Sequence, residues 1–186
     1  MYSSHKNQSG FTLIELIVVI VILGILSVTA IPRYLDITEE AHIATTEGVT
    51  GAFRAGVLLA NADYLVKHGS GEVAVLFEVE DENGSPLYVG ANESGNPVSS
   101  DGSNITLSSD NDCSDLWNGL LNTSLIAGTN QLAPFASAPD VIASLQTNAS
   151  GDDVDGVCNY LMSGAGVDMN LNYNSINGKV KLTRLN

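Results

Sequence analysis

Residues 9–32 read SGFTLIELIVVIVILGILSVTAIP, and this stretch decides how the rest of the chain is organised. The 21 residues from Phe11 to Ile31 would extend over about 31 Å as an α-helix, which matches the hydrocarbon thickness of a bilayer. Glu15 interrupts the apolar run, although a charged side chain inside a membrane helix costs free energy. The stretch therefore predicts a membrane-spanning helix that carries one acid in need of an explanation.

Two interpretations of this N-terminus differ in what remains on the mature protein. A secretory signal peptide would be removed as a whole, and residues 28–30 (VTA) offer a small-x-small cleavage site. Pro32 lies just beyond that site and argues against it. A cut between Gly10 and Phe11 would instead remove a polar leader and leave the apolar helix on the mature protein.

Residues 10–26, GFTLIELIVVIVILGIL, resemble the class III signal sequence of type IV pilins and of the related type II secretion pseudopilins. The continuation at residues 27–53, SVTAIPRYLDITEEAHIATTEGVTGAF, is similar to the mannose-sensitive haemagglutinin (MSHA) branch of the pilins. The close resemblance covers about residues 10–60, and only the general pilin plan is visible beyond them. Ser9 departs from the family pattern, because many members carry Lys or Arg there, and Lys6 is the leader's alternative source of positive charge.

The resemblance implies a processing step and an assembly step. A prepilin peptidase in the inner membrane would cut after Gly10, and the new N-terminal residue, Phe11, would be N-methylated. Glu15 matches the glutamate whose carboxylate pairs with the free amine of a neighbouring subunit's Phe11 during filament assembly. A buried carboxylate is tolerated when it is paired, so the cation created by cleavage would explain the acid. An intramolecular pair of Phe11 and Glu15, four residues apart, is the competing interpretation.

Gly24 and Pro32 are the two residues of the apolar stretch that disfavour a helix most. In the pilin interpretation, the segment between them loses helical hydrogen bonds when the filament packs. The alternative for Gly24 is a close contact between helices, which small residues allow in membranes.

After the membrane segment, a helical pattern continues from Arg33 to about His68. Apolar and small residues recur at spacings of three and four, at Tyr34, Ile37, Ala41, Ala44, Gly48, Ala52, Ala55, Leu59, Ala62 and Val66. This Ala- and Gly-rich face would let a partner surface approach closely. A helix from Thr12 to His68 would be roughly 85 Å long, so its second half should pack on a sheet of the head.

The expected fold class is α+β, the type IV pilin fold: a long N-terminal helix packed on a C-terminal antiparallel β-sheet head. We expect four segments: a cleaved leader (1–10), a membrane and polymerisation half of the helix (11–32), an amphipathic half (33–68) and a globular β head (69–186). Within the head the sequence predicts strands at 73–79 and 157–162, short strands at 87–89 and 105–107 in the polar tract 81–112, and a hairpin of 169–173 with 180–182 around Asn177-Gly178. It also predicts a short helix at 115–121 capped by Ser114, with Trp117 in the core, and a helical turn at 141–145.

Cys113 and Cys158 are the only cysteines, and in an exported domain they are best interpreted as one disulfide. Two buried free thiols are the alternative for a cytosolic head. The net charge of −14, from 7 basic and 21 acidic residues, argues against a nucleic-acid partner.

Few other residues suggest chemistry. Asp153 and Asp155 in the stretch GDDVDG loosely resemble a calcium loop, although an acidic turn is the simpler interpretation, and no other cofactor is expected. His42 and His68 are isolated on the expected helix and fit helix-surface packing. The sequence carries no phosphate-binding loop and no GxSxG or HExxH motif, so we expect a protein that is not an enzyme.

The resemblance favours a structural subunit of an MSHA-type pilus used for attachment. The subunit would be held in the inner membrane with a periplasmic head before assembly, and would lie in an extracellular filament afterwards. Its partners would be other pilin subunits, the prepilin peptidase and the assembly machinery. A type II secretion pseudopilin, a minor pilin and an unrelated single-pass periplasmic binding domain are the alternatives.

Overall fold

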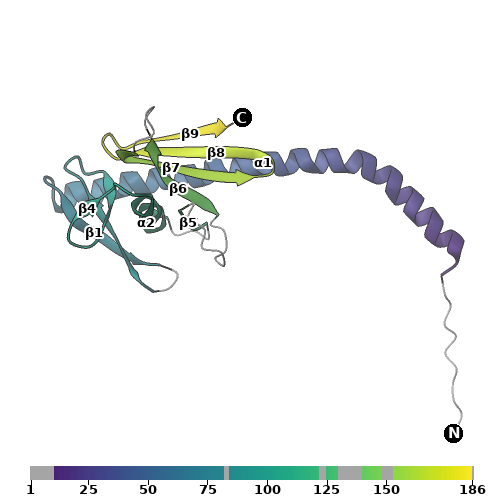
Figure 1. The fold of residues 1–186 in the computed structure, drawn as a ribbon, viewed down its shortest axis with the longest axis horizontal. Helices are drawn as coiled ribbons and strands as arrows, with labels where there is room; N and C mark the ends of the chain where they lie inside the picture. The colour runs from purple at the N-terminus through teal and green to yellow at the C-terminus, as the bar shows by residue number, and fades with distance from the viewer. Residues whose placement is uncertain (1–10, 82–83, 122–124, 130–139, 148–152, 186) are drawn as a thin grey trace, which may run out of the picture.

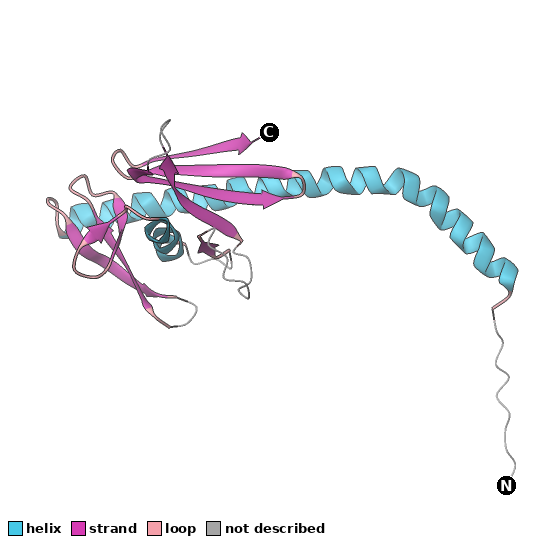
Figure 2. Ribbon diagram, in the orientation of Figure 1, coloured by secondary structure: helices cyan, strands magenta, loops and turns pink. Residues whose placement is uncertain are grey.

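The computed structural model describes residues 11–81, 84–121, 125–129, 140–147 and 153–185, and for Asp153 and Asp155 the backbone only. One long helix, α1 (Leu13–Lys67), runs from a free N-terminal half into a head that holds a second helix, α2 (Asp110–Leu120), and two sheets. All strands lie around the C-terminal half of α1 (Figures 1 and 2). The expected α+β arrangement, a long helix packed on a β-sheet head, is confirmed.

Both ends of α1 agree with the sequence prediction. Thr12 caps the N-terminus, and His68 caps the C-terminus with its backbone N–H donated to the Tyr64 carbonyl. Gly69 follows with a φ of 74°, a left-handed conformation that glycine adopts at little cost. The continuous helix of 55 residues is therefore about 80 Å long.

The head contains two separate sheets. The first has the order β1-β2-β3-β4 and is antiparallel; its strands are β1 (Val73–Glu80), β2 (Pro86–Ala91), β3 (Pro97–Ser100) and β4 (Ile105–Thr106). The second has the order β5-β6-β7-β8-β9; its strands are β5 (Ala127–Gly128), β6 (Val141–Thr147), β7 (Asp153–Gly164), β8 (Val167–Asn174) and β9 (Lys179–Leu185). All pairs of the second sheet are antiparallel except β5 with β6. The antiparallel head that was expected is thus divided into two sheets, with one parallel pair at the edge of the second.

The predicted strands are largely confirmed. The predicted strands at 73–79 and 157–162 lie within β1 and β7, and the hairpin around Asn177-Gly178 is β8 with β9. The short strands expected in the polar tract are β2 and β4. A third strand of that tract, β3, was missed because its sequence, PVSS, has four residues, of which one is proline and two are serine.

An aromatic cluster joins the helices to the second sheet. The ring of Phe53 on α1 lies 5.6 Å from that of Trp117 on α2, 5.4 Å from that of Tyr160 on β7 and 5.5 Å from that of Tyr173 on β8. All four side chains are fully buried. Burial raises the pKa of both tyrosines, whose hydroxyls donate to the carbonyls of Cys113 and Pro97. Trp117 is therefore a core residue, as predicted.

The short helix begins earlier than the sequence suggested. Its N-cap is Ser109, whose hydroxyl accepts a hydrogen bond from the Asp112 N–H, while the Asp112 carboxylate accepts one from the Ser109 N–H. This reciprocal pair is a capping box with aspartate in the third position. Ser114, the predicted cap, is buried and donates to the Ala127 carbonyl instead. The prediction was wrong because the S-x-x-D signal lay five residues upstream of Ser114.

The predicted helical turn at 141–145 is a strand, β6. Val141, Ala143 and Leu145 are buried, and the residues between them are partly exposed. This period of two is that of a strand with one buried face. The prediction was wrong because the nearby prolines suggested a loop and hid the alternation.

The buried stripe of α1 is not the Ala- and Gly-rich face. The side chains that the head covers belong to Thr46, Thr50, Phe53, Val57, Ala60 and Tyr64. The eight positions of the predicted face from Ala41 to Val66 are all exposed. Phe53 and Tyr64 bury far more apolar area than alanine does, so the head packs on the stripe that carries them. The small-residue face remains open.

We expect Asp115→Asn to raise the melting temperature of the protein at pH 7 and to change it little at pH 3. Burial, followed by the negative charges of Asp112 and Asp81, raises the pKa of the Asp115 carboxyl above its ordinary value of 3.8. The folded state therefore binds this proton more tightly than the unfolded state, and stability is lost as pH rises from that value through the folded-state pKa. Circular dichroism melts of both proteins in detergent at the two pH values test this; an equal effect at both would contradict it.

Candidate functional site

The N-terminal half of α1 is an apolar helix that the head does not cover. Its large apolar side chains between Leu13 and Ile37 are 41 to 76% exposed. Within the described residues, α1 is the one helix that is long and apolar enough to cross a membrane, with a mean hydropathy of 2.9 over its most apolar window. Figure 1 shows this half projecting beyond the head. Such a surface requires an apolar environment, either lipid or other protein chains.

Glu15 lies in the first turn of α1 and forms a capping box with Thr12. The Thr12 N–H donates to Glu15 Oε2 at 2.8 Å, and the Thr12 hydroxyl donates to the same oxygen at 2.7 Å. The Glu15 N–H in turn donates to Thr12 Oγ1 at 3.3 Å. No cation pairs with this carboxylate among the described residues. Sequence reasoning missed Thr12, although the T-x-x-E spacing is the signal of a capping box.

Gly24 and Pro32 both lie inside the continuous helix. Figure 1 shows that α1 curves over the half that contains them, as helices do at an interior proline, whose ring opposes the regular hydrogen bond. A Cβ added to Gly24 would meet no atom within 4 Å. Contacts within the chain therefore do not require glycine at this position.

The predicted disulfide between Cys113 and Cys158 is confirmed, with a Cα–Cα distance of 5.6 Å. Cys113 lies on α2, two residues before the helix that the sequence predicted at 115–121, and Cys158 lies on β7. Both residues are fully buried. The bond therefore fixes α2 against the second sheet, next to the aromatic cluster.

The calcium prediction falls on two side chains outside the described part of the structure. The backbones of Asp153 and Asp155 belong to β7, and their carboxylates are not described. No group of three or more His, Cys, Asp or Glu side chains suited to a metal occurs among the described residues. Calcium binding at Asp153 and Asp155 stays a prediction.

Each of the two histidines of α1 packs against another residue of the chain. His42 lies against Gly164, where an added Cβ would be 2.8 Å from the imidazole ring, and the ring of His68 stacks on Tyr64 with centroids 6.3 Å apart. These contacts agree with the predicted helix-surface packing.

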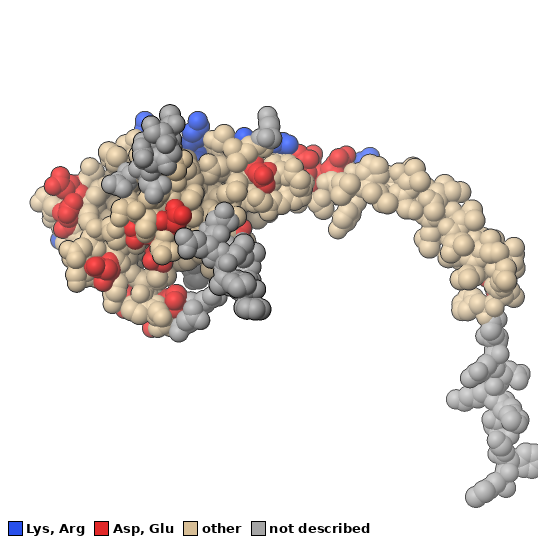
Figure 3. Space-filling model, in the orientation of Figure 1, with Lys and Arg blue, Asp and Glu red and all other residues tan. Residues whose placement is uncertain are grey.

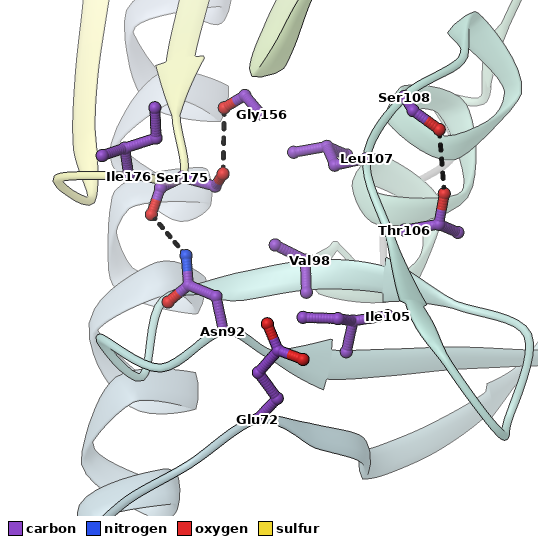
Figure 4. A pocket seen from close by; sticks show the side chains of 10 residues that line it. All are labelled: Glu72, Asn92, Val98, Ile105, Thr106, Leu107, Ser108, Gly156, Ser175 and Ile176. Carbon is purple, nitrogen blue, oxygen red and sulfur yellow. Dashed lines mark hydrogen bonds between the residues drawn. The ribbon is translucent and has the colours of Figure 1, made fainter.

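A groove of about 520 Å³ lies between the two sheets (Figure 4). It is lined by Glu72, Asn92, Val98, Ile105, Thr106, Leu107, Ser108, Gly156, Ser175 and Ile176. Most of its polar groups bond to one another: Asn92 donates to the Ser175 carbonyl at 2.8 Å, and the Ser175 hydroxyl donates to the Gly156 carbonyl at 2.9 Å. Figure 4 shows the Glu72 carboxylate directed into the groove, and this group has no partner among the described residues. One carboxylate over apolar walls does not provide the pair of groups that acid–base chemistry requires.

Comparisons with known proteins concern the N-terminal helix. A family described as the prokaryotic N-terminal methylation motif matches residues 5–31, which include Gly10, Phe11 and Glu15. The type IV narrow pilus major component PilA5 of Thermus thermophilus is 47% identical over 54 residues, covering 29% of this chain and 47% of the relative. The type IV major pilin protein PilE1 of Neisseria gonorrhoeae is 44% identical over 62 residues, covering 33% of this chain and 35% of the relative.

The N-terminal helix therefore carries the prokaryotic N-terminal methylation motif and is similar to that of type IV pilins. The type II secretion system core protein G of Pseudomonas aeruginosa is also similar, with 37% identity over 59 residues, which cover 32% of this chain and 42% of the relative. The chain thus spans less than half of the length of these curated relatives. No solved structure matches it. The similarity covers about a third of the chain at most, so these matches leave most of the head uncovered.

Proposed function

We propose that this protein is a structural subunit of a type IV pilus of the MSHA type, assembled into a surface filament for attachment. The observation that carries the proposal is the apolar half of α1, which continues without a break into a folded head and is left exposed by it. Lipid covers that half in the inner membrane, and the same half of other subunits covers it in a filament. The similarity of residues 27–53 to MSHA pilins supports the branch.

Processing precedes assembly in this proposal. The prepilin peptidase cuts after Gly10, removes residues 1–10 and leaves Phe11 as the methylated N-terminus. The methylation motif matched at residues 5–31 supports both steps. Residues 11–32 then form the membrane and polymerisation half of the helix, residues 33–68 the amphipathic half, and residues 69–186 the head.

Glu15 guides polymerisation once the leader has been removed. Its carboxylate is held at the N-terminus of α1 by Thr12, one residue from the amine that the cut creates on Phe11. A carboxylate in an apolar filament core is stable only with a cationic partner, and the Phe11 amine of a neighbouring subunit provides one. Gly24 and Pro32 allow the helix to lose hydrogen bonds as it packs, and the space around Gly24 leaves room for a neighbouring helix.

The open face of the amphipathic half also supports a homopolymer. Its exposed residues from Ala41 to Ala62 are mostly alanine and glycine, so another helix can approach its backbone closely. The head covers the opposite stripe, which keeps this face available for other subunits after folding.

A type II secretion pseudopilin is the second candidate, because the core protein G of that system is similar over 59 residues. Such a subunit would have the same anchor and the same cleavage. The two functions differ in where the protein is found: on long surface filaments or in the cell envelope.

Electron microscopy of sheared surface filaments with gold-labelled antibody to the head tests the proposal. Labelling along the whole filament is expected for a major pilin, and sparse or terminal labelling would indicate a minor one. Absence of the protein from filaments, together with a secretion defect in the deletion strain, would replace the pilus proposal with the pseudopilin.

A further inference from the structure

Basic residues gather along one edge of the head. Of the six lysines and arginines in the described residues, three lie on β9, namely Lys179, Lys181 and Arg184. A fourth, Arg54 on α1, donates from Nη2 to the Val180 carbonyl of the same strand. Figure 3 shows the blue side chains along the upper edge of the head, where Figure 1 places β9. Among the described strands, β9 pairs with β8 only, so it is an edge strand of the second sheet.

Two of these cations have no counterion. Lys179 and Lys181 are exposed, and because they are two residues apart on β9 they project from the same face, opposite Asn174 and Asn172 of β8. No carboxylate among the described residues lies within 4.0 Å of either ammonium group. Arg184, by contrast, pairs with Glu39 of α1 at 2.7 Å. The two lysines are therefore free to bind an acidic surface.

Acidic residues gather on the opposite side of the head. Glu78 and Glu80 are exposed on β1, which is the edge strand of the first sheet, and Asp81 and Asp115 lie next to this strand. The charges of Asp81 and Asp112 add to burial in raising the pKa of Asp115, so these carboxylates repel one another. Figure 1 places β1 below α1 and β9 above it. We refer to Glu78, Glu80, Asp81 and Asp115 as the acidic side.

The net charge of the chain indicates which surface binds the β9 edge. Identical subunits with a charge of −14 repel one another when they are packed side by side, and a contact of acidic surface with acidic surface would strengthen that repulsion. Contact between the β9 edge and the acidic side places opposite charges together and offsets part of that repulsion. Because the two surfaces are different, such a contact is heterologous, and its repetition without closure builds a helical filament.

We propose that the β9 edge of one subunit binds the acidic side of a second copy, with Lys179 and Lys181 facing Glu78 and Glu80. This inference rests on the proposed function, since it identifies the contact between heads in the filament. In this proposal the uneven charge of the head serves contact between subunits, and not the binding of an unrelated anionic partner.

The test is the yield of sheared surface filaments from cells that produce full-length variants. The double substitution Lys179→Glu and Lys181→Glu is expected to lower the yield at least about tenfold, because it places like charges in contact. Adding Glu78→Lys and Glu80→Lys is expected to restore it. The conservative pair Lys179→Arg and Lys181→Arg, and Lys67→Glu at the far end of α1, are controls expected to assemble like the unaltered protein.

Each outcome decides between alternatives. A normal yield from the Lys179→Glu, Lys181→Glu variant would overturn the contact and leave the pilus proposal intact, whereas absence of the unaltered protein from filaments would overturn the pilus proposal itself. Failure of the compensating substitutions, with normal amounts of subunit in the membrane, would overturn the acidic side as the partner. Normal filaments that lose binding of heparin would show that the edge binds an external polyanion, and would overturn the contact between copies.

Discussion

Replacing Glu15 with valine is expected to remove the protein from surface filaments and to leave its amount in the inner membrane unchanged. Valine is more favourable than glutamate in a bilayer, so insertion should not suffer. Filament packing would then leave the Phe11 amine of a neighbouring subunit without a counterion in an apolar core. Immunoblots of sheared filaments and of membranes measure the two quantities separately.

The Glu15 capping box requires a sharper control, because Glu15→Val also removes the bonds to Thr12. Glu15→Gln retains an oxygen that can accept from the Thr12 N–H, and glutamine is a regular residue of capping boxes. It removes the charge alone. Thr12→Ala removes the cap and retains the charge, at a cost to the helix terminus of roughly 0.5–2 kcal/mol.

If Glu15 acts through its charge, Glu15→Gln should fail to assemble and Thr12→Ala should assemble. If Glu15 serves only to cap the helix, the pattern should be reversed: the glutamine variant would form filaments and the alanine variant would not. Normal filaments from Glu15→Val would contradict both roles.

Replacing Cys113 and Cys158 together by alanine is expected to lower the free energy of unfolding of the head by about 4 kcal/mol. The bond closes a loop with a sequence separation of 45, and loop-closure entropy in the unfolded chain gives about that value. The loss should be large because the bond fixes α2, which carries Trp117, against the strand that carries Tyr160. Urea denaturation followed by tryptophan fluorescence measures it, since Trp117 is the only tryptophan.

Reduction of the unaltered protein provides the matched comparison. It breaks the same bond and leaves both side chains in place, so its effect should approach that of the double substitution. Equal unfolding curves with and without reductant would mean that the bond does not stabilise the head. A large effect of the alanine pair with no effect of reduction would assign the loss to packing around two buried side chains.

Two kinds of element were predictable from the sequence: long elements with a regular apolar pattern, and elements bounded by clear turn residues. The helix of 55 residues follows from its apolar run, from the spacings of three and four after it, and from Gly69 at its end. The β8–β9 hairpin follows from alternation on both sides of Asn177-Gly178. These signals are local, so they do not depend on what the rest of the chain does.

Short elements were less predictable. β6 has a buried face in its first five residues only, and β3 has four residues in all, so each offers too few positions to establish a period. The start of α2 depends on the Ser109–Asp112 capping box rather than on a hydrophobic pattern. At the candidate site Thr12 was missed in the same way, because its role also lies in a three-residue spacing of polar groups.

The sequence by itself determined the division into an apolar helix and an acidic head, the position of one acid in that helix, and the cysteines available for a bond. These properties depend only on the amino-acid composition and on the positions of residues along the chain. Only the tertiary structure decided which stripe of α1 the head covers, and therefore that the small-residue face stays open. It also decided that β9, which carries Lys179 and Lys181, lies on the other side of α1 from β1, which carries Glu78 and Glu80. Both depend on how two sheets pack around the large side chains of α1, since residues distant in sequence compete for the same buried surface.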